Sequence, residues 1–274
     1  MVNFPNAKIN LGLNITRKRE DGYHDIETVF YPLPIHDALE VITDHNTGEN
    51  VLFSSTGLPV QGSPESNLCV QAYMLLKKDF PKLASVKMHL HKTIPMGAGL
   101  GGGSADGAFT LQMLNKKFDL KLSKEQLIGY AFKLGSDCPF FIINKPCFAT
   151  GRGEKLEEIN ANLSAYKIII VNPAIHISTK TAFEHVIPTI PRFSIKDIAI
   201  QPVQSWKGRL VNDFEEPLFN LYPELQTLKD QLYNTGALYA AMSGSGSTFY
   251  GIFEKNAVIQ TSDFKNRYFV RIVD

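Results

Sequence analysis

Cysteine is scarce in this sequence, with only Cys69, Cys138 and Cys147 among 274 residues. The three form no C-x-x-C pair and are odd in number, which argues against a disulfide framework and against a zinc site built from cysteines. Reduced thiols in a cytosol fit this pattern best. We therefore expect a cytoplasmic protein.

The sequence also lacks an excess of positive or negative residues, and it has no long apolar run. Lysine and arginine number 28 against 27 aspartates and glutamates, so the net charge of +1 offers no polybasic field for nucleic acid or an acidic membrane. The densest apolar stretch, Ile168 to Val171, is far too short to span a bilayer. The first residues show no basic region followed by a long apolar run, as a signal peptide would. We expect no nucleic-acid or membrane partner, and any anion must be held by a local site.

The length of the chain favours two domains of ordinary size, and its apolar fraction of 44% is enough to build two cores. The polar segment Asn160 to Ala165 follows a predicted hairpin and precedes a predicted strand over residues 167–171. We therefore place the domains at residues 1–160 and 161–274.

Glycine is concentrated in one stretch, which reads T-I-P-M-G-A-G-L-G-G-G-S-A-D-G-A-F over residues 93–109. Five of the seven residues from Gly97 to Gly103 are glycine, which permits positive φ and a close approach of backbone amides to a ligand. Alternating apolar residues over 86–90 predict a strand before the loop, and helical spacing over 108–114 predicts a helix after it, capped by Ser104. Amide donors and the positive end of the helix dipole would meet there, as a phosphate chain requires.

Three other kinds of phosphate loop fit this stretch less well. Gly97, Gly99 and Gly102 satisfy G-x-G-x-x-G, but the nearest candidate for the acid of a dinucleotide fold, Asp119, follows a helix instead of a strand. A Walker A loop needs a Gly-Lys-Ser or Gly-Lys-Thr motif, and a protein-kinase loop needs V-A-I-K after it. Neither is present. A flexible surface linker is the remaining alternative, although linkers seldom lie between a patterned strand and a capped helix.

Polar residues with possible chemistry also occur near the start of the chain. Lys8 and Asn10 share one face of a predicted strand over residues 7–13. The pattern alone favours a solvent-exposed lysine on an edge strand. Asp21-Gly22 predicts a tight hairpin turn with Tyr23 and His24 directly behind it. Judged by residue type, such an aromatic pair is more often ordinary packing than a binding site.

Later in the chain, Asp137 lies in G-S-D-C-P-F-F, where it could be merely a turn or helix-cap aspartate. Phe183 lies on a short predicted helix opened by Ser178 and could be a core residue. A second glycine loop, S-G-S-G-S, joins predicted strands over 237–242 and 248–253. Further helices are expected over residues 67–80 and from a capping box at residues 123–126 to Gly135. Residues 184–211 show no pattern that we can assign.

Taken in order, the motifs resemble those of the GHMP kinases, the small-molecule kinases named for galactokinase, homoserine kinase, mevalonate kinase and phosphomevalonate kinase. The resemblance covers nearly the whole chain through A-K-I-N, D-G-Y-H, P-M-G-A-G-L-G-G-G-S, G-S-D-C-P-F-F, P-A-I-H-I-S-T and M-S-G-S-G. It is greatest to the branch that acts on cytidine diphosphate methylerythritol. The implied fold is α+β, with an N-terminal domain like domain 2 of ribosomal protein S5, a ferredoxin-like C-terminal domain, and the active site in the cleft between them.

The resemblance implies transfer of the ATP γ-phosphoryl group, with Mg²⁺, to the tertiary hydroxyl of that small-molecule substrate, a step toward isoprenoid precursors. Asp137 would take the hydroxyl proton, and Lys8 would keep the carboxylate ionised and offset charge on the phosphoryl group. Asn10 would bind substrate, Tyr23 and Phe183 would enclose the cytosine ring, and His24 would bind its edge. The triphosphate would be bound by Pro95, Met96, Gly97, Ala98, Gly99, Leu100, Gly101, Gly102, Gly103, Ser104 and Ala105. The M-S-G-S-G element would close over the site and support the phosphate loop.

Two alternatives remain open. Another kinase of the family, acting on homoserine or a mevalonate-type alcohol, would have no use for a cytosine site. A non-catalytic nucleotide-binding module would not need both Lys8 and Asp137. In oligomeric state, we expect a monomer or a weak homodimer.

Overall fold

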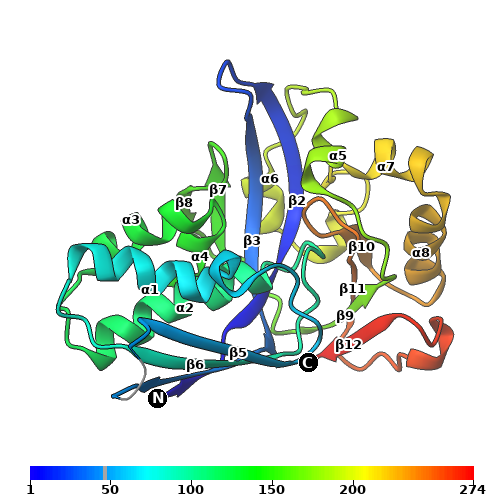
Figure 1. Ribbon diagram of the computed structural model, residues 1–274. Helices are drawn as coiled ribbons and strands as arrows, with labels where there is room; N and C mark the ends of the chain where they lie inside the picture. Colours follow the sequence, from blue (N-terminus) through cyan, green and yellow to red (C-terminus); the bar gives the residue numbers. More distant parts are fainter. Residues whose placement is uncertain (46–47) are drawn as a thin grey trace. The chain divides into compact units, whose positions relative to one another are not determined.

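The computed structural model describes residues 1–45 and 48–274 (Figure 1). The chain forms two compact units that are interleaved in sequence. Unit 1 comprises Met1–Ala7, Pro34–Met96 and Gly101–Asn144, and unit 2 comprises Lys8–Leu33, Gly97–Leu100 and Lys145–Asp274. These units are defined by spatial contact, whereas the boundary predicted at residue 160 concerns family domains and stays a prediction.

Unit 1 packs helices against one four-stranded sheet of order β1-β4-β6-β5. In this sheet β1 and β6 pair antiparallel to β4, whereas β5 runs parallel to β6. Figure 1 shows α1 and α2 beside β5 and β6. The strands are β1 (Val2–Asn3), β4 (Ala38–Thr43), β5 (Val51–Gly57) and β6 (Val86–Lys92), and the helices are η1 (Pro64–Ser66), α1 (Leu68–Asp79), α2 (Gly102–Lys117), α3 (Lys124–Leu134) and α4 (Cys138–Ile143).

Two long strands, β2 (Asn6–Lys18) and β3 (His24–His36), begin or end in unit 1 and run through unit 2. They form a four-stranded sheet with β7 (Cys147–Thr150) and β8 (Lys155–Glu158), in the order β2-β3-β7-β8. Both faces of β2 are buried, the apolar face with Ile9 and Leu11 and the polar face with Lys8 and Asn10, which is why this strand alternates less clearly in burial than β6.

Unit 2 also contains an antiparallel sheet of order β10-β11-β9-β12. Its core joins residues of this sheet, such as Val171 and Phe249, to Leu13 and Ile15 of β2 and to Leu228 of α8. The strands are β9 (Tyr166–Asn172), β10 (Tyr239–Met242), β11 (Phe249–Glu254) and β12 (Phe269–Val273), and the helices are α5 (Thr179–Glu184), α6 (Ile195–Ala199), η2 (Val203–Ser205), α7 (Glu215–Leu221), α8 (Pro223–Asn234) and η3 (Thr261–Asp263).

Most of the predicted elements are confirmed. The strand before the glycine loop is β6, the helix over residues 67–80 is α1, and Ser123 and Gln126 form both hydrogen bonds of the capping box that begins α3. The predicted cap of α2 is wrong. Gly101, with φ +70°, is the N-cap, so the helix begins at Gly102 and Ser104 lies inside its first turn. A left-handed glycine reverses the chain before any side-chain cap is needed.

The cysteines, residues 184–211 and the lengths of the helices complete the description. All three cysteines are buried free thiols. Residues 184–211, which the pattern did not assign, contain α6 and η2. No helix in the described part of the chain is long and apolar enough to cross a membrane.

Candidate active site

The glycine loop alternates left-handed glycines with buried apolar residues. Gly97, Gly99 and Gly101 have φ values of +62°, +79° and +70°. Ala98 and Leu100 between them are buried. The apolar side chains anchor the loop, so the intervening glycine backbone is held in a fixed shape. Successive amides in such a shape form an anion-binding concavity.

Backbone hydrogen bonds fix the first part of this loop within unit 2. The Lys8 amide donates to Leu100 O at 2.9 Å, and the Thr248 amide donates to Ala98 O at 3.3 Å. A Cβ on Gly99 would lie 2.0 Å from the carbonyl oxygen of Ser243. Only glycine therefore fits at residue 99.

The second glycine loop touches the first directly. Ser243 Oγ donates to Gly99 O at 2.8 Å and accepts from the Asn10 amide at 3.2 Å. Gly244 and Gly246 have φ values of +58° and +91°, so this loop also needs its glycines. These bonds give the S-G-S-G-S segment a supporting role toward residues 97–100.

The helix that follows the loop begins with backbone amides that have no partner inside the helix. The first intrahelical bond runs from the Ala105 amide to Gly101 O, so the amides of residues 102–104 have no partner inside α2. At 16 residues α2 is long enough to have a full dipole, whose positive end lies at these amides. This is a suitable site for phosphate oxygens.

Lys8 is buried, which excludes the solvent-exposed edge lysine. Its residue is only 3% exposed, and its ammonium donates to Asn10 Oδ1 at 2.6 Å. Asn10 in turn donates through Nδ2 to Thr28 Oγ1 at 2.9 Å, and Thr28 donates to Gly12 O at 2.5 Å. The Lys8 ammonium also lies 5.0 Å from the centre of the Phe30 ring. The lysine is thus held by β2 and β3 in one position.

Asp137 lies at the start of α4, close in the fold to the start of α2. It is the N-cap residue of α4 by position, but within the described structure its side chain makes no capping bond. The next residue, Cys138, is buried and hydrogen-bonded to Ser104, and burial raises the pKa of its thiol to about 12. A neutral thiol thereby ties α4 to the first turn of α2. Asp137 therefore occupies the turn and cap position without a side-chain capping bond, and its role in the reaction stays a prediction.

Lys8 and Asp137 belong to different units, and their joint action at a hydroxyl stays a prediction.

The predicted hairpin turn is confirmed and determines where Tyr23 and His24 lie. Gly22 has φ +82°, and Asp21 Oδ1 accepts the Tyr23 amide at 3.1 Å. Tyr23 is 51% exposed, and the Arg152 guanidinium lies 3.7 Å from the centre of its ring. One face of the tyrosine is therefore covered by a cation.

His24 and Phe183 lie against each other. Their ring centres are 4.7 Å apart with an interplanar angle of 16°. Phe183 also meets Phe214 edge-on, so it is part of the core as well as a partner for His24. Burial, helped by the charge of Lys18, lowers the pKa of His24, so its ring is neutral at pH 7. The predicted stacking of a base between Tyr23 and Phe183 stays a prediction.

Sequence reasoning missed the residues that support these groups. Asn212 Nδ2 donates to Met242 O at 2.8 Å and to Gly244 O at 2.9 Å, so it holds the second glycine loop. The Tyr250 hydroxyl donates to Asn10 O at 3.0 Å. Nothing in the sequence around Asn212 indicates a partner at residue 244.

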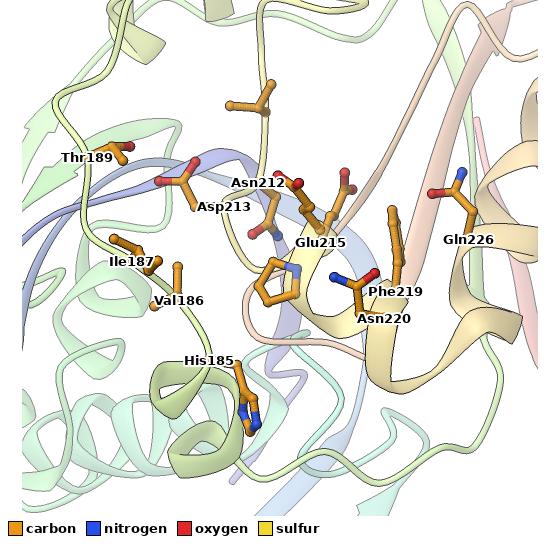
Figure 2. Close-up of a pocket in the computed structure, with 13 residues that line it drawn as sticks. His185, Val186, Ile187, Thr189, Asn212, Asp213, Glu215, Phe219, Asn220 and Gln226 are labelled. Carbon is orange, nitrogen blue, oxygen red and sulfur yellow. The ribbon is translucent and has the colours of Figure 1, made fainter.

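A separate cavity of about 820 Å³ lies in unit 2 beside α7 (Figure 2). Two of the acidic side chains that line it are already bonded to other parts of the protein. Asp213 accepts from Asn14 Nδ2 and the Ile15 amide, and Glu215 pairs with Lys229. None of the predicted site residues lines it. The lining residues are His185, Val186, Ile187, Thr189, Val211, Asn212, Asp213, Glu215, Glu216, Pro217, Phe219, Asn220 and Gln226.

The described residues contain no group of three or more His, Cys, Asp or Glu side chains that could hold a metal ion.

Comparison with known proteins agrees with this geometry. The family described as "GHMP kinases N terminal domain" matches residues 67–145, and "GHMP kinases C terminal" matches residues 200–268. A 4-diphosphocytidyl-2-C-methyl-D-erythritol kinase of Bacteroides fragilis is 49% identical over 97% of this chain and 96% of its own length. One of Cytophaga hutchinsonii is 50% identical over 92% of both chains.

Solved structures give the same result. A crystal structure of 4-(cytidine 5'-diphospho)-2C-methyl-D-erythritol kinase has a TM-score of 0.78 and 30% identity, over 93% of this chain and 91% of that one. A mevalonate kinase structure has a TM-score of 0.73 at 13% identity, over 100% and 99% of the two chains, which indicates a shared fold alone. The chain therefore belongs to the GHMP kinases, among the relatives named 4-diphosphocytidyl-2-C-methyl-D-erythritol kinase.

Proposed function

We propose that this protein transfers the γ-phosphoryl group of ATP to the tertiary 2-hydroxyl of 4-diphosphocytidyl-2-C-methyl-D-erythritol, in the non-mevalonate route to isoprenoid precursors. The observation that carries the proposal is the built phosphate loop. Its left-handed glycines alternate with buried anchors, and it leads into the N-terminus of a 16-residue helix. High identity to relatives of that name over nearly the whole chain supports the choice of substrate.

In the proposed reaction, the amides of residues 97–104 bind the triphosphate. Asp137 accepts the hydroxyl proton as the oxygen attacks the γ-phosphorus, and the bond to the ADP oxygen breaks. Lys8, fixed by Asn10 and Thr28, supplies a cation for the charge on the transferred group. Mg²⁺ bound together with ATP would neutralise part of the charge on the phosphate oxygens.

The cytosine is proposed to stack on Tyr23 and Phe183, with His24 at its edge. A neutral His24 can donate or accept one hydrogen bond to the base. Because the His24 ring already lies on one face of Phe183, a base can stack on that face only after His24 has moved. Buried, reduced cysteines suit a cytoplasmic enzyme.

The test is phosphate transfer from labelled ATP to a panel of alcohols: the cytidylyl substrate, the same polyol phosphate without its nucleotide, homoserine and mevalonate. We expect product only with the cytidylyl compound. Equal transfer to homoserine or mevalonate would favour the other kinases of the family. Nucleotide binding without transfer to any alcohol would favour a non-catalytic module.

A further inference from the structure

A buried ion cluster lies beneath the start of α2, within unit 1. Lys92, the last residue of β6, has a side chain with 0% exposure, and its ammonium pairs with Asp37 and, at 2.7 Å, with Asp106 Oδ2. A Cβ on Gly102 would come within 3.0 Å of this ammonium. The lysine nitrogen is therefore directly beneath the first residue of the helix.

Asp37 joins the same cluster to the other side of the glycine loop. Its Oδ1 accepts the amides of Thr93 at 2.6 Å and Ile94 at 2.9 Å, the two residues that lead into the loop. The cluster thus touches the chain both where it approaches the loop and where it leaves it. A change in the charge of the cluster acts on both places at once.

The cluster carries more negative than positive charge when both carboxylates are ionised. Two buried carboxylates then face a single ammonium, an arrangement that is costly at low dielectric. Within the described residues, Asp106 Oδ1 is buried and has no hydrogen-bond partner. Asp37, by contrast, accepts two amides and the ammonium, so both of its carboxylate oxygens have hydrogen-bond partners. The excess charge therefore falls on Asp106.

The surroundings of Asp106 favour a proton at that carboxyl. Burial first, and then the charge of Asp37, raise its pKa to about 7 against the attraction of Lys92. From α1 the buried Cys69 thiol faces it, and burial keeps that thiol neutral by raising its pKa. When protonated, Asp106 can donate a hydrogen bond to the neighbouring Asp37 carboxylate.

We propose that Asp106 is a positioning residue for the nucleotide, acting through Lys92 on the start of α2, and that it becomes more fully protonated when the triphosphate binds. The inference rests on the proposed function, in which the amides above the cluster bind ATP. A bound triphosphate brings several negative charges close to the cluster, and like charge disfavours the ionised carboxylate. The proton comes from solvent and stays on Asp106. By linkage, nucleotide affinity falls as pH rises above 7.

The experiment is calorimetric titration of the protein with a non-hydrolysable ATP analogue in excess Mg²⁺ at pH 8, in two buffers of different ionisation enthalpy. The difference between the two apparent enthalpies gives the number of protons taken up. A group with a pKa of about 7 is mostly ionised at pH 8, so a bound-state pKa raised by one unit or more gives an uptake of roughly 0.4 proton or more per nucleotide.

Two variants make the result specific. Asp106→Asn keeps the shape and an acceptor for Lys92 but cannot titrate, so its uptake should fall to near zero and its affinity should depend less on pH. Asp44→Asn removes another buried carboxylate of unit 1, one paired with Lys87, and should leave the uptake as in the wild type.

Normal nucleotide binding by the wild type with no proton uptake overturns the inference while the proposed function stands. Equal uptake by Asp106→Asn assigns the proton elsewhere and also overturns it. If the wild type does not bind the analogue at all, the proposed function fails and the inference fails with it. The wild-type measurement needs no variant, so an absence of proton uptake overturns the inference even if Asp106→Asn does not fold.

Discussion

Asp137 is the residue whose change should affect the chemical step most. Asp137→Asn keeps the size of the side chain but cannot accept a proton, so we expect kcat to fall by ~10²–10⁴ with little change in either KM. Steady-state kinetics with both substrates measure this. Asp119→Asn is a matched control, because Asp119 is an exposed carboxylate paired with Lys121. A kcat close to that of the wild type would mean that the Asp137 carboxylate takes no part in the reaction.

Tyr23 should matter for the cytidylyl substrate and not for ATP. Removing the ring in Tyr23→Ala should raise the KM of the cytidylyl substrate about ten-fold or more, on the ~1–3 kcal/mol scale of a stacked base. Tyr23→Phe keeps the ring that Arg152 covers, so it should behave nearly as the wild type. If Tyr23→Ala has the wild-type KM, the base does not stack on this residue.

The free protein should lose stability as pH rises through neutrality because of Asp106. Burial raises its pKa in the folded state to about 7, whereas an unfolded aspartate titrates near ~3.9. The folded state thus binds the Asp106 proton more tightly than the unfolded state does. The resulting contribution to the free energy of unfolding is fully present below pH ~4 and is lost as pH rises through about 7. Tm measured from pH 5 to 8.5 should fall more for the wild type than for Asp106→Asn. Parallel curves for the two proteins would contradict this.

Among the structural elements, the glycine loop is the one in which a single added methyl group should lower both stability and ATP affinity. In Gly99→Ala the new Cβ meets Ser243 O and the residue is forced to a positive φ, so we expect a loss of at least roughly 1–3 kcal/mol in the free energy of unfolding and weaker ATP binding. Gly129→Ala, at an open position inside α3, should instead stabilise by ~0.5–1 kcal/mol. Denaturant unfolding and nucleotide titration measure both effects. Unchanged ATP affinity in a folded Gly99→Ala would rule out the loop as the phosphate site.

The elements that could be predicted from the sequence are those determined by neighbouring residues. The alternation of β6 and the capping box of α3 each lie within a few residues, and both are confirmed. The start of α2 was missed because the φ of Gly101, not a side-chain oxygen, decides it. Likewise, the short β12 carries a weak apolar pattern and was not foreseen.

The environment of the site residues could not be predicted, because it depends on partners far away in the chain. Lys8 reads as an exposed edge lysine until β3 and Tyr250 bury the strand beside it. The ion cluster is invisible in the sequence for the same reason, since Lys92 is 55 residues from Asp37 and 14 from Asp106.

For the whole molecule, the interleaving of the two units predicts that the C-terminal part does not fold alone. Leu13 and Ile15 belong to the core of unit 2, and Asp213 accepts the Ile15 amide. We therefore expect the fragment 145–274 to show no cooperative thermal unfolding by circular dichroism. The same fragment fused to residues 8–33 should regain it. A cooperative transition in the shorter fragment, with the Tm of the fused one, would contradict this prediction.

The same interleaving sets an order of events during synthesis. The β2–β3 hairpin leaves the ribosome before most of its partners in unit 2, which begin at Lys145. At ~5–20 residues per second, the chain between them takes on the order of ten seconds to make. During that time Leu13 and Ile15 of β2 lack the unit 2 core in which they are finally buried, so their apolar side chains are open to contacts outside the fold.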